Sequence, residues 1–321
     1  MTDEIQTDEI QTDEVQSGEA QTEAYKSGRV ALVGRPNAGK STLMNQLLEE
    51  KLAIVSDKPQ TTRNRIVGIL SEERGQIVFY DTPGVHKPQH AMNRRMIKAA
   101  QEALNEADVV CLLVDASQKP GTGDDYMREW VAQSESHKVV ILNKIDKVRK
   151  PDLLPRIAEY AEGGKYQEII PVSALKGDGV DRVTDVLWQL LPTGEPYYDP
   201  ELLTIHPERF LVAERIREKV LGVTREELPF STAVLIERYE ETPTLVKIYA
   251  SILVEREGQK KILIGAKGAT IKKIGTAARY DLERYLETRV FLDLKVRMEK
   301  NWRENRRILS DLDRAPVDVT F

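Results

Sequence analysis

The N-terminal two-thirds of the chain alternates short apolar runs with segments whose apolar residues recur at helical spacing. Each run is followed by a loop and then by a segment of helical period, such as 41–48 or 93–106. Strands that are buried on both faces read as continuous apolar runs, and parallel strands need crossover helices. The pattern therefore predicts an α/β domain with a doubly wound, mostly parallel sheet. Its strands are expected at residues 30–33, 77–80, 109–114, 139–142 and 169–172.

A proline-rich segment interrupts this alternation at residues 191–200. It holds three prolines and one glycine, which favour turns over regular structure. The order beyond it, α-β-β-α-α-β, predicts an α+β second domain. We expect a helix at 208–220, strands at 231–238 and 244–255 with a turn at 241–243, a helix ending at Gly265, a helix at 269–287, a strand at 290–296 and a basic helix ending near residue 309.

The first 28 residues are acidic and begin with a five-residue repeat, TDEIQ, TDEIQ, TDEVQ and SGEAQ. Five residues advance a helix by about 500°, so the apolar members spread around the axis and form no stripe. We expect a disordered tail; a docking tail or an artificial extension is the alternative. The predicted organisation is a tail at 1–28, a first domain at 29–196 with a linker to about residue 200, a second domain at 201–309 and a C-terminal tail at 310–321.

Cysteine content and hydropathy narrow the class of protein. The 321 residues include one cysteine, so neither an internal disulfide nor a zinc site built on several cysteines can form. The longest apolar run, residues 109–114, falls well short of the roughly 20 residues that span a bilayer. The four histidines show no metal-ligand spacing. Because the N-terminus also lacks the basic and then apolar profile of a secretory signal, we expect a cytoplasmic protein.

The net charge of −5 is distributed unevenly along the chain. Residues 1–28 hold eight acidic residues and one lysine, so the remainder of the chain carries a net charge of +2. Between residues 260 and 307 there are fourteen Lys and Arg against six Asp and Glu, a local excess of +8. Such a surface attracts polyanions, which makes a nucleic acid a candidate partner.

A phosphate-binding sequence directly follows the first predicted strand. Residues 34–41 read GRPNAGKS and match G-x-x-x-x-G-K-[ST] between a strand and a helix, the context that the motif requires. In such a loop the backbone amides face the α- and β-phosphates, Lys40 reaches the β and γ oxygens, and Ser41 supplies a hydroxyl ligand to Mg²⁺. The alternative is a glycine-rich turn between strand and helix.

Three further strand ends carry polar motifs. Asp81 of D-T-P-G can hold Mg²⁺ through water, and Gly84 can offer its amide to the γ-phosphate. In N-K-I-D, the carboxylate of Asp146 can accept both N1–H and the amino group of guanine, a donor pair that adenine lacks. Ser173 and Ala174 can turn a backbone amide toward guanine O6. Each motif alone could be ordinary strand-end loop chemistry; together they predict GTP in preference to ATP.

The second domain contains a G-x-x-G loop between two predicted helices. Its glycines allow a sugar-phosphate backbone to approach, and a cleft beside such a loop holds about four unpaired nucleotides. Lysines surround the loop, and the element order is that of a type II KH domain, which the segment resembles. The alternative is a protein-docking module. The residues expected to bind RNA are Ile264, Gly265, Ala266, Lys267, Gly268, Lys272 and Lys273.

From residue 29 to about 305 the chain resembles the Era-type GTPases, of the translation-factor-related branch of the GTPase superfamily. The resemblance implies a first switch at 60–63, where Thr62, in preference to Thr61, binds Mg²⁺ when the γ-phosphate is present. From the sequence alone that segment reads as a solvated loop. Expected nucleotide contacts are Gly34, Arg35, Pro36, Asn37, Ala38, Gly39, Lys40, Ser41, Thr42, Asp81, Thr82, Pro83, Gly84, Asn143, Lys144, Asp146, Ser173 and Ala174; expected metal ligands are Ser41, Asp81 and Thr62 or Thr61.

Hydrolysis is expected to be slow. Small signalling GTPases place a glutamine after D-x-x-G to orient the attacking water, and here that residue is Val85. We expect no general base, transition-state stabilisation by Lys40, Asn37 and Gly84, and an unassisted rate on the order of 10⁻³ s⁻¹ or below. In related enzymes an asparagine at the position of Asn37 helps to hold K⁺, so potassium is a hypothesis here.

The resemblance also implies the biological setting. It implies a monomeric GTP-hydrolysing switch that binds 16S-type ribosomal RNA near its 3′ end, acts in assembly of the small ribosomal subunit and contacts the inner face of the cell membrane peripherally. No DNA partner is expected. One alternative is a metabolic or motor ATPase, against which N-K-I-D argues. The other is a GTP-controlled scaffold whose KH-like domain docks proteins.

Overall fold

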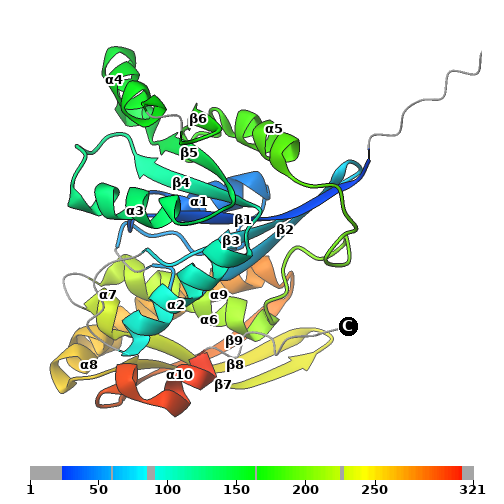
Figure 1. Cartoon of the computed structure of the whole chain (residues 1–321). Helices are drawn as coiled ribbons and strands as arrows, with labels where there is room; N and C mark the ends of the chain where they lie inside the picture. Colours follow the sequence, from blue (N-terminus) through cyan, green and yellow to red (C-terminus); the bar gives the residue numbers. More distant parts are fainter. Residues whose placement is uncertain (1–23, 59–60, 85–90, 163–164, 225–227, 313–321) are drawn as a thin grey trace, which may run out of the picture.

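The first domain is a six-stranded sheet with helices on both faces (Figure 1). The computed structural model describes residues 24–58, 61–84, 91–162, 165–224 and 228–312. The strand order is β2-β3-β1-β4-β5-β6, and all five predicted strands are present and parallel. The strands are β1 (Lys26–Gly34), β2 (Ile66–Glu72), β3 (Gly75–Asp81), β4 (Val109–Asp115), β5 (His137–Asn143) and β6 (Glu168–Pro171).

Strand β2 is absent from the sequence prediction and runs antiparallel to β3. Only Glu73 and Arg74 connect the two strands. An antiparallel hairpin needs no crossover helix, so the alternation of strands and helices in the sequence does not reveal β2. Residues 66–70 are apolar except for Gly68, and that run was the available signal. The chain also enters the sheet earlier than expected. Residues 26–28, assigned to the acidic tail, pair with the start of β3 and belong to β1.

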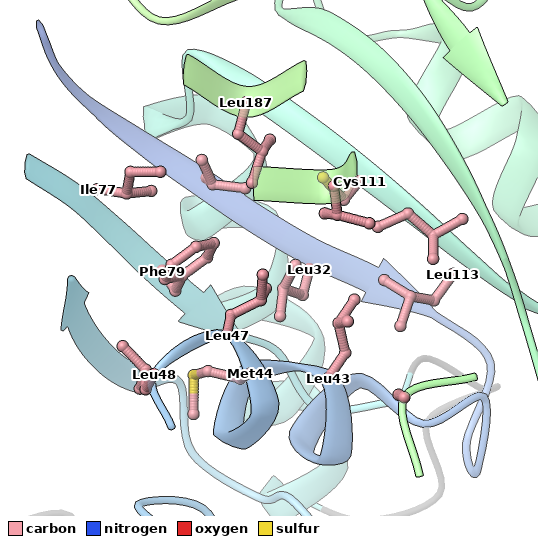
Figure 2. Packing of buried hydrophobic residues seen from close by; sticks show 14 of the residues in the cluster. Leu32, Leu43, Met44, Leu47, Leu48, Ile77, Phe79, Cys111, Leu113 and Leu187 are labelled. Carbon is pink, nitrogen blue, oxygen red and sulfur yellow. The ribbon is translucent and has the colours of Figure 1, made fainter. Parts of the chain in front are cut away.

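The strands divide their side chains between two cores because successive residues point to opposite faces. One face is covered by α1 (Lys40–Leu47) and α5 (Val180–Leu190). Figure 2 shows Leu43 and Leu47 of α1 packed against Leu32 and Phe79 of the sheet. The other face is covered by α2 (Ala91–Glu106), α3 (Thr122–Ala132) and α4 (Lys150–Ala161). Burial on both faces explains the continuous apolar runs, and it also buries Cys111 of β4.

The second domain has the predicted order of elements around a three-stranded sheet, β7-β8-β9. Strands β7 and β8 are antiparallel, and β8 and β9 are parallel. The hairpin turn lies at 243–244, not at 241–243, because β7 continues to Thr242. The elements are α6 (Glu208–Val223), α7 (Leu228–Ser231), β7 (Ala233–Thr242), β8 (Leu245–Val254), α8 (Glu257–Ile264), α9 (Ala269–Tyr285), β9 (Arg289–Met298), η3 (Trp302–Glu304) and α10 (Arg306–Leu312).

The two domains share packed surfaces. Helix α6 lies between the two sheets (Figure 1), and its Phe210 and Leu211 join the core beneath α1. On the other side Met92 and Met96 of α2 pack with Trp302 and Leu253 of the second domain. Trp302 is fully buried in this interface. Among the described residues, we find no helix that combines the length and the apolar character needed to cross a membrane.

The linker between the domains runs beside the outer strand β2. Ile69 N donates to Leu203 O at 2.8 Å, and Val67 N donates to His206 Nε2 at 2.9 Å. These bonds occupy backbone groups that an edge strand would otherwise expose. His206 is 8% exposed and stacks on Phe210 at the start of α6. The imidazole therefore joins the first domain to the second in its neutral form, because Nε2 accepts the Val67 N–H.

Acidification should weaken this junction. Burial lowers the pKa of His206 from 6.5 to about 4, while the charge of Glu214 opposes that shift. Between pH 6.5 and 4 the His206 imidazole is protonated in the unfolded chain but stays neutral in the folded chain. The free energy of unfolding therefore decreases as the pH falls from 6.5 toward 4. We expect a loss of roughly 2 to 3 kcal/mol over that range. Denaturant unfolding of wild type and His206→Gln checks this; equal pH dependence between pH 6.5 and 4 in both would contradict it.

Candidate functional site

The phosphate-binding loop connects the end of β1 to α1 at the centre of the sheet. Gly39 has φ +99°, and a Cβ there would lie 2.2 Å from Asn143 Nδ2, so the loop requires glycine at this position. Lys40 follows at the first turn of α1. Its ammonium group is buried and donates to Gly34 O at 3.2 Å and Arg35 O at 3.1 Å. Burial lowers the pKa of Lys40 while the charge of Asp81 opposes that shift.

Three side-chain oxygens converge beside Lys40. Ser41 Oγ donates to Asp81 Oδ2 at 2.6 Å and lies 2.9 Å from Thr62 Oγ1, which donates to Asp81 Oδ2 at 3.2 Å. Asp81 is fully buried, and its Oδ1 has no hydrogen-bond partner among the described residues. Burial raises the pKa of Asp81, against the opposing charge of Lys40. A carboxylate and two hydroxyls are the hard oxygen donors that suit Mg²⁺, so the residues fit that ion.

The segment predicted to be the first switch brings one of the two candidate threonines to this cluster. Thr62 lies there, whereas Thr61 Oγ1 donates to Lys58 O at 2.6 Å. Thr82, also expected at the site, instead donates to Leu32 O at 2.8 Å and is fully buried. Gln60 and Val85 lie outside the described residues.

The predicted guanine-reading loops meet beside the phosphate loop. Asn143 Nδ2 donates to Ala38 O at 2.8 Å, and Ser173 Oγ donates to Asp146 Oδ1 at 2.7 Å. The Ala174 amide, predicted to face guanine O6, donates to Asn143 Oδ1 at 3.0 Å in this structure. Lys144 reaches across to the phosphate loop and donates to Asn37 O at 2.6 Å.

Several residues at the site were not predicted. Asp115, at the end of β4, holds the Lys144 ammonium at 2.6 Å. Asn37 Nδ2 donates to Asp57 O at 2.8 Å, so the phosphate loop is tied to the segment before the switch. In the sequence, the signals for these contacts were a polar residue at the end of β4 and polar residues in the connection between α1 and β2. A cavity of about 320 Å³ is lined by Pro36, Asn37, Gly39, Lys40, Ser41, Thr42, Ile54, Val55, Ser56, Asp57, Thr61, Thr62, Gly84, Lys144, Lys147 and Leu175.

The remaining predicted contacts of the phosphate loop lie around this cavity. Arg35 pairs with Asp124 of α3 at 2.8 Å, which turns its side chain away from the cavity lined by Lys40 and Ser41. Ala38 is buried under Asn143, and Pro83 is buried directly before Gly84. Four separate stretches of sequence, 34–42, 61–62, 81–84 and 143–146, thus meet at one sheet edge, where parallel α/β sheets bind ligands.

The G-x-x-G loop joins α8 to α9, as predicted. Gly265 (φ +73°), Lys267 (φ +49°) and Gly268 (φ +79°) all have positive φ, which makes the reversal between the helices tight. Lys267, Lys272 and Lys273 are exposed, and Ile274 anchors α9 in the core. Ile262, on α8, is 59% exposed. Cations and an apolar side chain thus flank a loop that a phosphate backbone can approach. In the basic segment that follows β9, Arg303 pairs with Glu255, whereas Arg306 and Arg307 are exposed.

The two halves match two family models. Residues 29–144 match the family described as 50S ribosome-binding GTPase, and residues 227–303 match the KH domain family. Over 288 residues the chain is 48% identical to the GTPase Era of Geotalea uraniireducens, covering 89% of this chain and 97% of that protein. The chain belongs to the Era family of GTPases. The Era of Heliobacterium modesticaldum is 45% identical over 288 residues, covering 89% of this chain and 96% of that protein.

Solved Era structures share the fold. An Era complex with MgGDPNP and nucleotides 1506–1542 of 16S ribosomal RNA aligns with a TM-score of 0.87 at 37% identity, covering 90% of this chain and 99% of that one. Aquifex aeolicus Era bound to GDP·AlF4⁻ aligns with a TM-score of 0.86 at 37% identity, with the same coverage. These comparisons confirm the predicted Era-type resemblance, including the GTPase domain followed by a KH domain.

Proposed function

We propose that this Era-family GTPase hydrolyses GTP with Mg²⁺ and uses the nucleotide state to control a KH domain that binds the 3′ region of small-subunit ribosomal RNA, in assembly of that subunit. The observation that carries the proposal is the hydrogen-bonded cluster of Ser41, Thr62 and Asp81, beside a cavity that Ser41, Thr62 and Lys144 of the N-K-I-D loop help to line. The second domain of the same chain carries a G-x-x-G module.

The predicted site residues have distinct roles in this proposal. Lys40 would move from the loop carbonyls to the β and γ oxygens of GTP, exchanging two neutral acceptors for charged ones. Ser41, Thr62 and Asp81 would hold Mg²⁺, which supplies positive charge to the phosphates when bound. Asp146 would accept the two guanine donors while Ser173 fixes its orientation. Gly84 would donate its amide to the γ-phosphate.

The RNA ligand is proposed from the relatives. A 16S ribosomal RNA fragment is bound by the Era structure to which this chain is 37% identical over 90% of its length. Support within this chain comes from the exposed lysines beside the G-x-x-G loop and from the local charge excess between residues 260 and 307. Peripheral contact with a membrane and the monomeric state stay predictions.

Two binding measurements on the full chain test the proposal. Labelled GTP should bind in magnesium buffer and resist displacement by ATP at a hundredfold excess; displacement by ATP would favour the ATPase alternative. A single-stranded RNA carrying the 3′ end of 16S ribosomal RNA should bind with a strong salt dependence and with an affinity that differs between GDP and GDPNP. If the affinity for RNA is the same with GDP and with GDPNP, and the protein captures a protein partner, the scaffold alternative would be favoured.

The potassium hypothesis gives a separate prediction. Asn37 is tied to the backbone of Asp57, so a monovalent cation held there would lie between the phosphate loop and the switch segment. We expect GTP turnover at least fivefold faster in K⁺ than in Na⁺, and loss of that difference in Asn37→Ala. Steady-state phosphate release in matched KCl and NaCl buffers measures this. Equal wild-type rates in the two salts would remove potassium from the mechanism.

A further inference from the structure

Helix α6 of the second domain holds the backbone of residues 51–61, the segment that leads to Thr62, at three points. Arg215 Nη2 donates to Lys51 O at 2.7 Å, and Val55 N donates to Glu218 Oε1 at 3.1 Å. Arg217 Nη2 donates to Thr61 O. These contacts join groups more than 150 positions apart in the sequence. A helix of the RNA-binding half therefore holds the chain that leads to Thr62.

The side chains that make these contacts are themselves fixed. The Arg217 side chain is only 3% exposed, and Glu214, one turn earlier on α6, holds it at 2.5 Å. The Glu218 side chain is 12% exposed and accepts from Lys51 at 2.6 Å and Lys219 at 2.7 Å. Buried side chains with charged partners keep one geometry, because breaking one pair leaves the other charge uncompensated. Helix α6 therefore presents a rigid face to the switch.

The residue after Thr62 is also bound to the second domain. Arg63 Nη1 donates to Thr232 O at 2.5 Å, and its guanidinium lies 5.9 Å from the ring of Trp302. The chain is thus tied to the second domain on each side of Thr62, through the backbone of Thr61 and through the side chain of Arg63. The Thr62 hydroxyl has little freedom to leave the position beside Ser41 and Asp81 while the two domains keep this arrangement.

We propose that Arg217 and Glu218 are positioning residues of the GTPase site: through the backbone at Thr61 and Val55 they hold Thr62 where it completes the magnesium site. The inference rests on the proposed function. If Thr62 binds Mg²⁺ only when the γ-phosphate is present, it raises the affinity for GTP relative to GDP. Residues that hold Thr62 in place therefore raise that relative affinity as well. By linkage, RNA that stabilises this domain arrangement raises the affinity for GTP, and GTP raises the affinity for RNA by the same factor.

The test compares Arg217→Ala and Glu218→Gln with wild type in full-length protein. Dissociation constants for fluorescent GDPNP and GDP are measured across a Mg²⁺ titration. We expect each variant to weaken GDPNP about tenfold, to change GDP less than twofold and to raise the Mg²⁺ concentration that GDPNP binding needs. Arg217→Lys, which keeps a cationic donor, should recover part of the loss. Arg209→Ala is the matched control, since Arg209 is on α6 and packs on Tyr239 away from the switch.

A Thr62→Ala background separates positioning from general damage. Arg217→Ala should cost little further GDPNP affinity once the Thr62 hydroxyl is gone, because the two changes remove the same interaction. Equal weakening of GDP and GDPNP, or full additivity with Thr62→Ala, would overturn the inference. If Arg217→Ala fails to fold, Glu218→Gln decides by the same criteria. Failure of the wild-type protein to bind GDPNP would instead overturn the proposed function.

Discussion

Replacing Asp146 with asparagine should convert a GTP site into a site for xanthosine triphosphate. Guanine presents two donors to the Asp146 carboxylate, whereas xanthine presents N1–H and a carbonyl oxygen at C2. An asparagine offers one acceptor and one donor, which pair with N1–H and the C2 carbonyl of xanthine. With guanine, the NH₂ of the asparagine side chain instead faces the amino group of the base, and two donors meet. For guanine, the change weakens one charge-assisted hydrogen bond to a neutral one, removes the other and sets two donors against each other. We expect this to cost about 3 to 5 kcal/mol, or roughly a thousandfold in GTP affinity.

The geometry around Asp146 allows this exchange without other damage. Asp146 is exposed, and its carboxylate accepts a hydrogen bond from Ser173 Oγ at 2.7 Å. The amide oxygen of asparagine can accept the same bond, so the loop should keep its shape. Competition of labelled XTP and GTP for Asp146→Asn measures the effect. A variant that loses GTP without gaining XTP, at unchanged thermal stability, would show that Asp146 does not read the base edge.

Motifs of contiguous sequence made most of the nucleotide site predictable. The phosphate loop sits at a strand end, and parallel strands bring their carboxyl ends to one edge of the sheet, so Lys40, Asp81 and Asp146 had to lie near one another. The same reasoning failed for β2, whose antiparallel hairpin leaves no crossover helix to mark it. The hydrogen bond from the Ala174 amide to Asn143 Oδ1 was likewise not foreseeable, because the direction of a backbone amide depends on the local turn and no residue type encodes it.

Contacts between the domains were beyond the sequence patterns. Arg215, Arg217 and Glu218 read as ordinary charged residues on an amphipathic helix, yet the structure buries or half-buries them against the switch. In the segment that leads to Thr62 they bind backbone groups, and these carry no sequence signal. The choice of Thr62 over Thr61 shows the same limit. The two residues are chemically identical, and only the path of the chain between Asn37 and Arg63 decides which one reaches Ser41.

The two glycines of the G-x-x-G loop differ in what they tolerate, and that difference permits a clean test of RNA binding. Gly265 (φ +73°, ψ 176°) adopts a conformation open essentially to glycine alone, and a Cβ there would lie 2.2 Å from Thr270 Oγ1. Any substitution at Gly265 should therefore distort the turn between α8 and α9. Gly268 has φ +79° in the left-handed helical region, and a Cβ there would meet nothing within 4 Å.

Gly268→Asp should therefore abolish tight RNA binding while the domain stays folded. Asparagine and aspartate are the non-glycine residues that tolerate left-handed backbone, and they have nearly the same shape. The pair differs by one charge placed where a phosphate backbone would approach. Juxtaposing like charges costs several kcal/mol at an interface, so we expect RNA affinity to fall by at least 300-fold in Gly268→Asp and by less than tenfold in Gly268→Asn.

Salt and nucleotide controls complete this test. Raising KCl from 50 to 300 mM should narrow the gap between the two variants, since screening weakens the added repulsion. GTP affinity without RNA should match wild type in both, because Gly268 lies in the other domain from the nucleotide cavity. Fluorescence anisotropy with the 3′ ribosomal RNA fragment gives the constants. Equal RNA affinity for the aspartate and asparagine variants would place the RNA surface elsewhere on the protein.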